Sequence, residues 1–244
     1  MHKNQILTIL SLIDLTTLND NDTENVVEQL VNKANTGFEN VHPAAVCVYS
    51  NFGNFAANIS KTKVAVVGGC FPSGQTLIEA KAAEYKLIQQ LNVDEVDIVI
   101  NRGDLIASDF ENVAKDVKAA RSIFTNKSLK VIIESGELNA ELIKKASEIA
   151  ISEGADFIKT STGKSKTGAT PEAAQIMCNV IQNHFTQTGK KIGFKASGGI
   201  RTKEDADKYI NIVKNTLGDE WINPSLLRIG ASSLYDNLID SLKA

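Results

Sequence analysis

Two lysines stand at the centres of two short apolar segments, where charged side chains are uncommon. Lys159 lies within Phe157-Ile158-Lys159-Thr160-Ser161-Thr162-Gly163-Lys164, and Lys195 lies within Ile192-Gly193-Phe194-Lys195-Ala196-Ser197-Gly198-Gly199. Both segments combine apolar, β-branched or small residues with a closing glycine, which is typical of a buried strand that runs into a turn. A lysine inside a buried strand must be paired, uncharged or used for chemistry.

The chemistry open to such a lysine is nucleophilic attack on a carbonyl. An amine with a pKa near ~10.4 is almost fully charged at neutral pH, and lowering the pKa to about 7 takes roughly 4–5 kcal/mol. Burial and a second ammonium nearby can supply this. A neutral lysine and a carbonyl compound form a Schiff base, whose iminium accepts electrons when an adjacent C–C bond breaks or forms. The spacing predicts Lys159 and Lys195 as such a pair, with Asp97 relaying protons.

A purely structural alternative is that both lysines form ion pairs with Asp97 and Glu134. We favour the chemical interpretation because the same feature occurs on two strands, each ahead of a glycine turn.

The hydrophobic pattern predicts eight strands, each followed by a helical segment. The strands are expected near residues 12–16, 44–49, 63–67, 95–101, 130–135, 157–162, 192–197 and 226–230. The helices include single long ones over 73–91 and 104–125, one that starts at Pro171 behind a Thr170 cap, and a short extra helix over 2–10. Alternating units of this kind predict the α/β class and one (β/α)₈ TIM barrel domain over residues 1–244. An open doubly wound sheet is the alternative, but no G-x-G-x-x-G follows the first strand.

Alternation along the strands sorts side chains between the barrel interior and the helix layer. One consistent parity places Lys159, Lys195, Asp97, Asp14 and Thr16 inside. Asp14 is then either a structural carboxylate or a substrate contact. Cys47 has the same inward parity and is a candidate substrate contact, although a buried cysteine is more often a small apolar filler.

A second set of residues, in the turns after the last three strands, indicates a phosphate site. In barrels these loops often bind phosphate, since glycines let backbone N–H groups approach an anion. The candidates are Gly163, Lys164, Gly198, Gly199, Arg201, Gly230, Ser232 and Ser233. A Walker P-loop is excluded because its first glycine would fall at Ile158.

Composition limits the remaining classes of function. The 244 residues carry a net charge of −3 without a basic block, so we expect no binding to nucleic acid or to a membrane surface. The longest apolar runs are too short to span a bilayer, and the N-terminus lacks a signal-peptide core. Three scattered cysteines suit reduced thiols, and a cytoplasmic protein is expected. The three histidines lie far apart, so no metal is predicted.

Over nearly its whole length the sequence resembles the deoxyribose-phosphate aldolases, which are class I (Schiff-base) aldolases. The blocks that carry the resemblance are Asp14-Leu15-Thr16-Thr17-Leu18, Glu95-Val96-Asp97, Lys130 to Leu138, Gly154 to Gly163, Gly193 to Thr202 and Arg228 to Ser233.

The resemblance implies reversible cleavage of 2-deoxy-D-ribose 5-phosphate to D-glyceraldehyde 3-phosphate and acetaldehyde, without a cofactor. It implies that Lys159 is the nucleophile, and that Lys195 lowers its pKa and transfers protons with Asp97. Asp14 and Thr16 would face sugar hydroxyls, and the glycine-turn residues would hold the phosphate. It also implies a role in deoxynucleoside catabolism in the cytoplasm, and a homodimer.

Two departures accompany the resemblance. Asn101-Arg102-Gly103 is similar to the shorter bacterial branch, and the sequence ends at Leu242-Lys243-Ala244 where some relatives continue to a tyrosine. Water or Asp97 would then carry the proton step of that tyrosine. Two alternatives stay open: a Schiff-base aldolase for another phosphorylated sugar, and a sugar-phosphate-binding barrel without catalysis.

Overall fold

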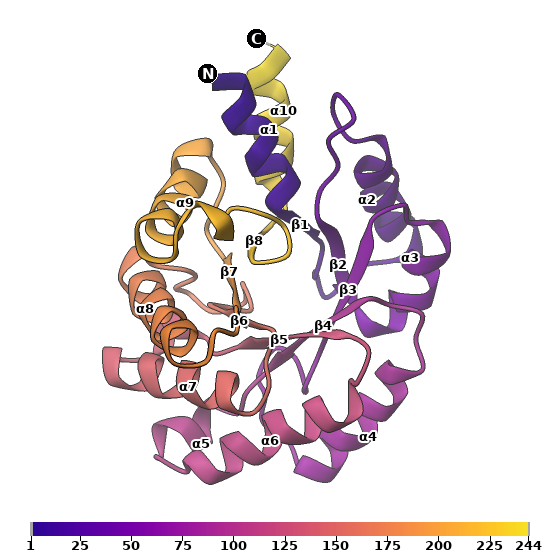
Figure 1. The fold of residues 1–244 in the computed structure, drawn as a ribbon. Helices are drawn as coiled ribbons and strands as arrows, with labels where there is room; N and C mark the ends of the chain where they lie inside the picture. The colour runs from indigo at the N-terminus through magenta and orange to yellow at the C-terminus, as the bar shows by residue number, and fades with distance from the viewer. Residues whose placement is uncertain (1, 244) are drawn as a thin grey trace.

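The protein folds as a closed barrel of eight parallel strands surrounded by helices (Figure 1). The computed structural model describes residues 2–243, apart from the side chain of His2. Each strand pairs with the next, and β8 pairs with β1. The strands are β1 (Ile13–Thr16), β2 (Ala45–Tyr49), β3 (Lys63–Gly68), β4 (Glu95–Val99), β5 (Ser128–Ile132), β6 (Phe157–Lys159), β7 (Gly193–Ser197) and β8 (Leu227–Ala231). The predicted (β/α)₈ class is confirmed. The single domain over 1–244 stays a prediction, and residues 1 and 244 lie outside the described part.

Helices follow the strands around the barrel, and an extra helix precedes β1. They are α1 (His2–Leu12), α2 (Glu24–Thr36), α3 (Gly53–Ile59), α4 (Ile78–Gln89), α5 (Arg102–Ile106), α6 (Phe110–Ile123), α7 (Ala140–Ser152), α8 (Pro171–Thr188), α9 (Lys203–Leu217) and α10 (Ser233–Lys243). Short 3₁₀ turns are η1 (Ser50–Phe52), η2 (Ser135–Glu137) and η3 (Asp219–Trp221). The helices α1 and α10 lie side by side, which brings both ends of the described chain together (Figure 1). No helix among the described residues is long and apolar enough to cross a membrane.

Capping residues explain where several helices begin. They also explain why the helix predicted over 104–125 is wrong. The expected helix over 104–125 is two helices. Asn101 caps α5 through the N–H groups of Gly103 and Asp104, and Asp109 caps α6. Between them Ser108 has a φ of 63°, which a continuous helix does not allow. The predicted start at Thr170 and Pro171 is confirmed, since the Thr170 hydroxyl accepts from Ala173 N–H.

Further predicted boundaries are wrong for identifiable reasons. Strand β5 ends at Ile132 rather than residue 135, because Glu134 has a φ of 54°, which a strand does not allow. Helix α4 starts at Ile78 rather than residue 73, because the preceding loop turns at Gly74, where φ is 73°. Strand β6 ends at Lys159 rather than residue 162. Beyond it the backbone N–H and hydroxyl of Thr162 bond to Glu134, so this segment leaves the ladder.

The apolar residues fall into two separate clusters. The larger one fills the space between the strands and the helices, and it includes Leu15, Ile98, Ile158 and Phe194. These are the positions whose parity predicts an outward direction, and packing them against helices removes them from water. The smaller cluster lies inside the barrel and consists of Leu18, Cys47, Ala65 and Val67, with Tyr49 and Phe71 beside them. The rest of the interior is left for polar groups.

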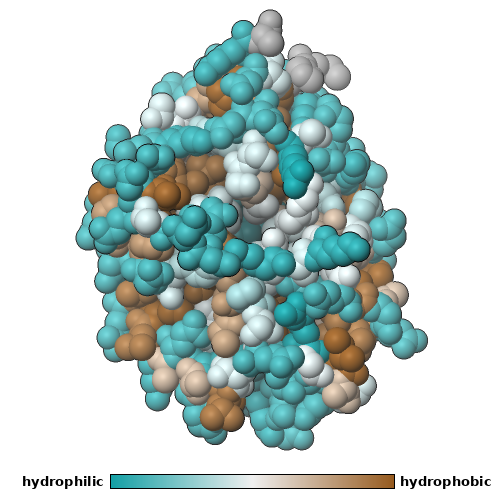
Figure 2. All heavy atoms as spheres, turned by 180° about the vertical axis from the view of Figure 1, so that it is seen from behind, coloured by the Kyte–Doolittle hydropathy of each residue, from teal (hydrophilic) through white to brown (hydrophobic). Residues whose placement is uncertain are grey.

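The face of the molecule that Figure 2 shows is mostly hydrophilic. Figure 2 shows the face opposite to that of Figure 1, where hydrophobic side chains gather in separate groups among hydrophilic and neutral ones. Among the described residues, the large hydrophobic side chains that are exposed lie on or beside α4 and α5: Leu77, Ile78, Leu87 and Ile106.

Candidate active site

Lys159 and Lys195 lie opposite each other on neighbouring strands. They are direct register partners in the β6–β7 pair. Each Nζ donates to the same oxygen, Oδ2 of Asp97 on β4, at 2.7 Å. The side chains of all three are buried, with Lys159 3% exposed. The strand parity therefore brings together the three residues that the sequence assigns to chemistry.

Three further charged residues lie beneath them, and the sequence analysis did not assign these to the interior. Lys130 on β5 donates to Glu95 at 2.5 Å and to Asp97 at 2.9 Å. Arg228 on β8 donates to Asp14 at 2.5 Å and to Glu95 at 2.7 Å. The same alternation that selects Asp97 also selects Glu95, two residues earlier, so this carboxylate had a signal in the sequence.

Burial and ion pairing shift these groups in different directions. Burial is the largest influence on the Lys159 amine; the Asp97 carboxylate opposes it and the Lys195 ammonium adds to it, so the pKa of Lys159 is lowered. Burial acts on Lys195 in the same way, but the carboxylates of Asp14 and Asp97 outweigh it and raise the pKa of Lys195. Lysine is nucleophilic only as the neutral amine, so the geometry distinguishes Lys159 from its neighbour.

The carboxylates of the interior are held in the charged form. Burial would raise the pKa of Asp97, but Lys130, Lys159 and Lys195 together hold it well below its usual range. Burial also opposes ionisation of Asp14, and the Arg228 guanidinium and the two nearby lysines hold its pKa below the ordinary value. Both carboxylates are therefore ionised in this arrangement and accept hydrogen bonds from the cations around them.

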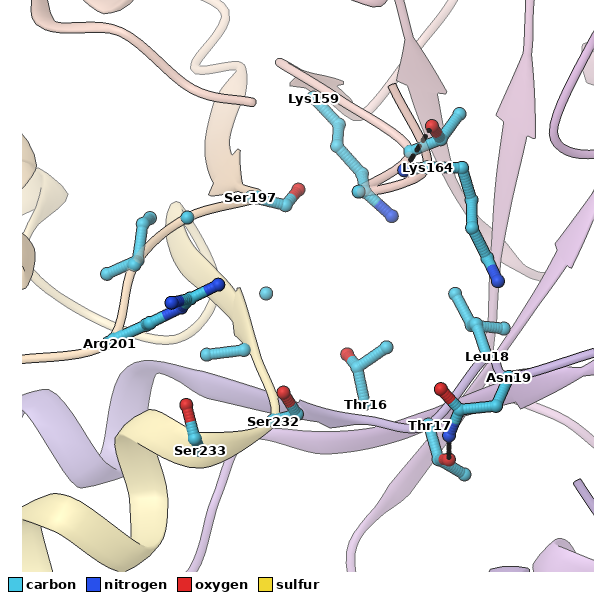
Figure 3. Close-up of a pocket in the computed structure, with 17 residues that line it drawn as sticks. Thr16, Thr17, Leu18, Asn19, Lys159, Lys164, Ser197, Arg201, Ser232 and Ser233 are labelled. Atoms are coloured by element: carbon cyan, nitrogen blue, oxygen red, sulfur yellow. Dashed lines mark hydrogen bonds between the residues drawn. The ribbon is translucent and has the colours of Figure 1, made fainter. Parts of the chain in front are cut away.

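Above Lys159 lies a cavity of about 340 Å³ at the carboxyl ends of the strands. Lys159 and Lys164 extend into it from one side, Arg201 from another and Thr16 from below, as Figure 3 shows. Its lining residues are Thr16, Thr17, Leu18, Asn19, Lys159, Thr162, Gly163, Lys164, Ser197, Gly198, Gly199, Ile200, Arg201, Gly230, Ala231, Ser232 and Ser233. This is the end of the barrel where enzymes of this fold bind substrates.

The residues predicted for phosphate all line this cavity. Gly163, Gly198 and Gly199 have φ values of 80°, 87° and 84°, a backbone region that favours glycine. A Cβ on Gly198 would lie 2.9 Å from the Cα of Gly168, so this turn needs glycine for space as well. Ser233 is the first residue of α10, whose free N–H groups and dipole favour an anion.

Glu134 has a different partner from the one considered for it. Both lysines form the ion pairs with Asp97 that the structural alternative predicted, but neither pairs with Glu134. Its carboxylate accepts from Thr162 N–H at 3.1 Å, from the Thr162 hydroxyl at 2.5 Å and from Ser165 at 2.9 Å. It thus ties the end of β5 to the loop that carries Gly163 and Lys164.

Gly230 joins the rim to the buried lysines. A Cβ at this position would lie 2.9 Å from the Ser197 Cβ and 3.2 Å from the Lys195 Cε. Gly230 lies opposite Ser197 in the β7–β8 register. Its missing side chain therefore leaves room for Lys195, in addition to its place on the cavity wall.

The other predicted site residues divide between the cavity and the layer below it. Thr16 lines the cavity, whereas Asp14, Cys47, Asp97 and Lys195 lie beneath it. Asp14 is completely buried and gives one oxygen to Arg228 and the other to Lys195, so its predicted contact with a sugar hydroxyl stays a prediction. Cys47 packs with Ala65 and Val67, as expected of a small filler, and burial raises the pKa of its thiol.

The sequence analysis missed the part of the cavity wall that follows β1. Thr17, Leu18 and Asn19 line it, and Thr17 and Asn19 are held by hydrogen bonds to Asp22. These residues could have been predicted from the sequence, because they directly follow a strand whose carboxylate, Asp14, points inward. Among the described residues no group of three or more His, Cys, Asp or Glu side chains is placed to hold a metal ion.

A pair of buried lysines lies below a rim of glycine turns, hydroxyls and cationic side chains in a (β/α)₈ barrel. This arrangement defines a candidate site for carbonyl chemistry of the Schiff-base type. A model of the DeoC/LacD family of aldolases matches residues 8–236, and the chain belongs to this family.

Individual proteins give the same picture. A Caenorhabditis elegans protein provisionally named as a deoxyribose-phosphate aldolase is 40% identical over 250 residues, which cover 99% of this chain and 82% of that protein. The structure of QR15, an aldolase, is 32% identical with a TM-score of 0.79 and covers 96% of each chain. A tetrameric deoxyribose phosphate aldolase from Aeropyrum pernix has a TM-score of 0.75 over 100% of this chain and 97% of its own; at 24% identity this likeness shows the fold alone.

Proposed function

We propose that this protein is a deoxyribose-phosphate aldolase that cleaves 2-deoxy-D-ribose 5-phosphate reversibly to D-glyceraldehyde 3-phosphate and acetaldehyde. The observation that carries the proposal is the position of Lys159. It is the lysine of the interior cluster that lines the cavity, and its pKa is lowered by burial, with Lys195 adding to the effect. Family membership and the 40% identical relative support the substrate.

The proposed reaction begins when the Lys159 amine attacks the aldehyde carbon of the open-chain sugar and water leaves, which forms an iminium. A base removes the proton of the C3 hydroxyl, the C2–C3 bond breaks, and its electron pair moves toward the iminium nitrogen to give an enamine. Glyceraldehyde 3-phosphate departs. Protonation of the enamine carbon and addition of water then release acetaldehyde and the free amine.

The neighbouring groups have proposed roles that follow from their contacts. Asp97 accepts from both lysines through one oxygen, so it can pass a proton between them or to water. Lys195 contributes charge that disfavours a second ammonium at Lys159. Thr16 lines the cavity, where a sugar hydroxyl would reach it.

The rim is the proposed site of the 5-phosphate. Gly198 and Gly199, the hydroxyls of Ser232 and Ser233, and the side chains of Lys164 and Arg201 line the cavity, with Lys164 and Arg201 on different sides of it (Figure 3). Cradles of this kind bind phosphate through N–H groups and positive charge. The catabolic role, the cytoplasmic location, the absence of a cofactor and the homodimer that the family resemblance implies belong to the same proposal.

Borohydride trapping tests this function directly. The protein is incubated with deoxyribose 5-phosphate and reduced, and the added mass is located by peptide mapping. We expect the adduct on the Lys159 peptide, and its loss in Lys159→Leu. Lys208→Leu is the matched control, because this lysine is exposed on α9 and pairs with Asp205 outside the cavity, so its removal should leave the adduct at Lys159. A folded protein that forms no adduct would instead indicate a binding barrel without catalysis.

A further inference from the structure

The charged side chains beneath Lys159 form a closed ring in which positive and negative groups alternate. Following the ion pairs gives the order Asp14, Arg228, Glu95, Lys130, Asp97 and Lys195, and from there back to Asp14. The five links other than Lys195–Asp14 measure 2.5–2.9 Å, and Lys195–Asp14 is also in direct contact. We call these six residues the charge ring.

The charge ring is complete without Lys159. It contains three cations and three carboxylates, and each side chain contacts a neighbour of opposite sign on both sides. Lys159 approaches from the cavity side and shares Asp97 Oδ2, which Lys195 already contacts. A charged Lys159 would therefore be a fourth cation facing three carboxylates in a buried space. An uncompensated charge there is costly, and a lysine avoids the cost by losing its proton.

We propose that Lys130, Glu95 and Arg228 are positioning residues that act through charge: they complete the charge ring, so that Lys159 is the surplus amine and stays neutral. This inference rests on the proposed function and extends it to residues that do not touch the substrate. The ring requires its own cations to keep their protons and Lys159 to lose its proton. The pKa shifts agree in direction, since the pKa of Lys159 is lowered and those of Lys130, Lys195 and Arg228 are raised.

Other groups near Lys159 do not change this balance. Cys47 on β2 is buried with a raised pKa and stays neutral. Lys63 at the start of β3 reaches Glu95 at 3.5 Å, but its side chain is 56% exposed and water screens it. Lys164 at the rim pairs with Asp20 and does not enter the ring. Phe157, the other inward residue of β6, places its ring near Lys130 and Arg228 and carries no charge.

The ring makes a signed prediction for charge removal. Lys130→Met leaves three carboxylates and two ring cations, so Lys159 becomes the third cation and keeps its proton. We expect its pKa to rise by about one unit or more, which means roughly tenfold fewer neutral amines at a fixed pH. In Lys130→Met/Glu95→Gln, one charge of each sign is removed, and Lys159 is again the surplus amine. The double variant should therefore recover the wild-type pKa.

Competitive labelling measures this without the substrate. The wild type and the variants are acetylated with trace acetic anhydride over a range of pH, and the labelling midpoint of the Lys159 peptide is read by mass spectrometry. Lys127→Met is the matched control. Lys127 is also a poorly exposed lysine, but it donates to the carbonyls of Leu91 and Val93 and contacts no ring carboxylate. Its removal should leave the midpoint unchanged.

The outcomes separate this inference from the proposed function. A midpoint that rises in Lys130→Met and returns in the double variant supports the charge ring, and a midpoint that stays the same in both overturns it. If Lys130→Met does not fold, Glu95→Gln decides, because removing a carboxylate must move the midpoint down; an upward or absent shift overturns the ring. A wild type with a low midpoint but no borohydride adduct would overturn the proposed function alone.

Discussion

The barrel interior below Lys159 and the rim above it are built in opposite ways. The interior holds the six charged side chains of the charge ring, which are at most 2% exposed and contact one another directly. The rim consists of glycines, hydroxyls and two cationic side chains around an open cavity. In the interior the protein satisfies its own charges, so the electrostatic environment is fixed before a substrate arrives. At the rim the donors border an open cavity, and Lys164 among them pairs with the exposed side chain of Asp20, so the energy of their hydrogen bonds is available for binding.

The interior should therefore determine the rate of the chemical step, and the rim should determine the affinity for the phosphorylated substrate. Changes in the interior should alter kcat and the pH profile, whereas changes at the rim should alter KM for phosphorylated substrates. Gly230 borders both regions and should affect both. The following predictions test this division.

The largest effect is expected for Asp97→Asn. This removes the carboxylate that three lysines share, so both the proton relay and the charge balance are lost. We expect kcat to fall by roughly 10²–10⁴-fold, the range for loss of general acid–base catalysis, while KM changes little. Steady-state kinetics measure this, with circular dichroism as the folding control. A rise in KM at constant kcat would contradict the division.

Acid should destabilise the protein through the interior. The pKa values of Asp14, Glu95 and Asp97 are below their ordinary values, so unfolding takes up protons once the pH falls below about 4. The stabilisation is fully present above that pH and is lost as the pH falls toward the folded pKa values. We expect a loss on the order of 2 kcal/mol between pH 5 and pH 3, measured by urea unfolding. A smaller loss of stability is expected in Lys130→Met/Glu95→Gln, which lacks one of the three carboxylates. An equal loss in that variant would show that the acid sensitivity arises from other groups.

At the rim, Arg201→Met should raise KM for deoxyribose 5-phosphate by about tenfold, the value of one charge-assisted contact. The reaction with unphosphorylated deoxyribose should not change, because it lacks the group that Arg201 is proposed to bind. Comparing the two substrates is therefore the measurement. Lys208→Met is the control, since Lys208 is exposed on the nearby helix α9 and pairs with Asp205 outside the cavity. Equal losses for both substrates would remove Arg201 from the phosphate site.

The smallest effect is expected for Gly230→Ala. The added methyl group must displace Ser197 or the Lys195 side chain, at a cost of about 1 kcal/mol or roughly fivefold in rate. Because Gly230 borders both regions, kcat should fall and KM should rise together. Gly199→Ala is a useful comparison. No atom lies within 4 Å of the Cβ that this substitution adds, but the φ of 84° at residue 199 strains the backbone of any residue other than glycine. A change in KM alone for Gly230→Ala would restrict this glycine to the rim.

Strand periodicity made the upper part of the site predictable. The central lysines of two strands, Asp97 on a third and the glycine turns are local features, and alternation alone places them inside or at the rim. The helix start at Thr170 was likewise local, because a cap needs only its own next three residues. These statements depend on the order of residues and not on which strands meet.

What only the tertiary structure decided is how the charges pair. Asp14 and Arg228 are 214 residues apart in sequence, and Lys195 and Asp14 are 181 apart. Their contacts depend on barrel closure between β8 and β1 and on the register of every strand between them. One residue of slip would turn each inward side chain toward the helices. The sequence therefore predicted two inward lysines and, through the family resemblance, Lys159 as the nucleophile. Only the closed barrel decided that the six charges beneath Lys159 pair with one another.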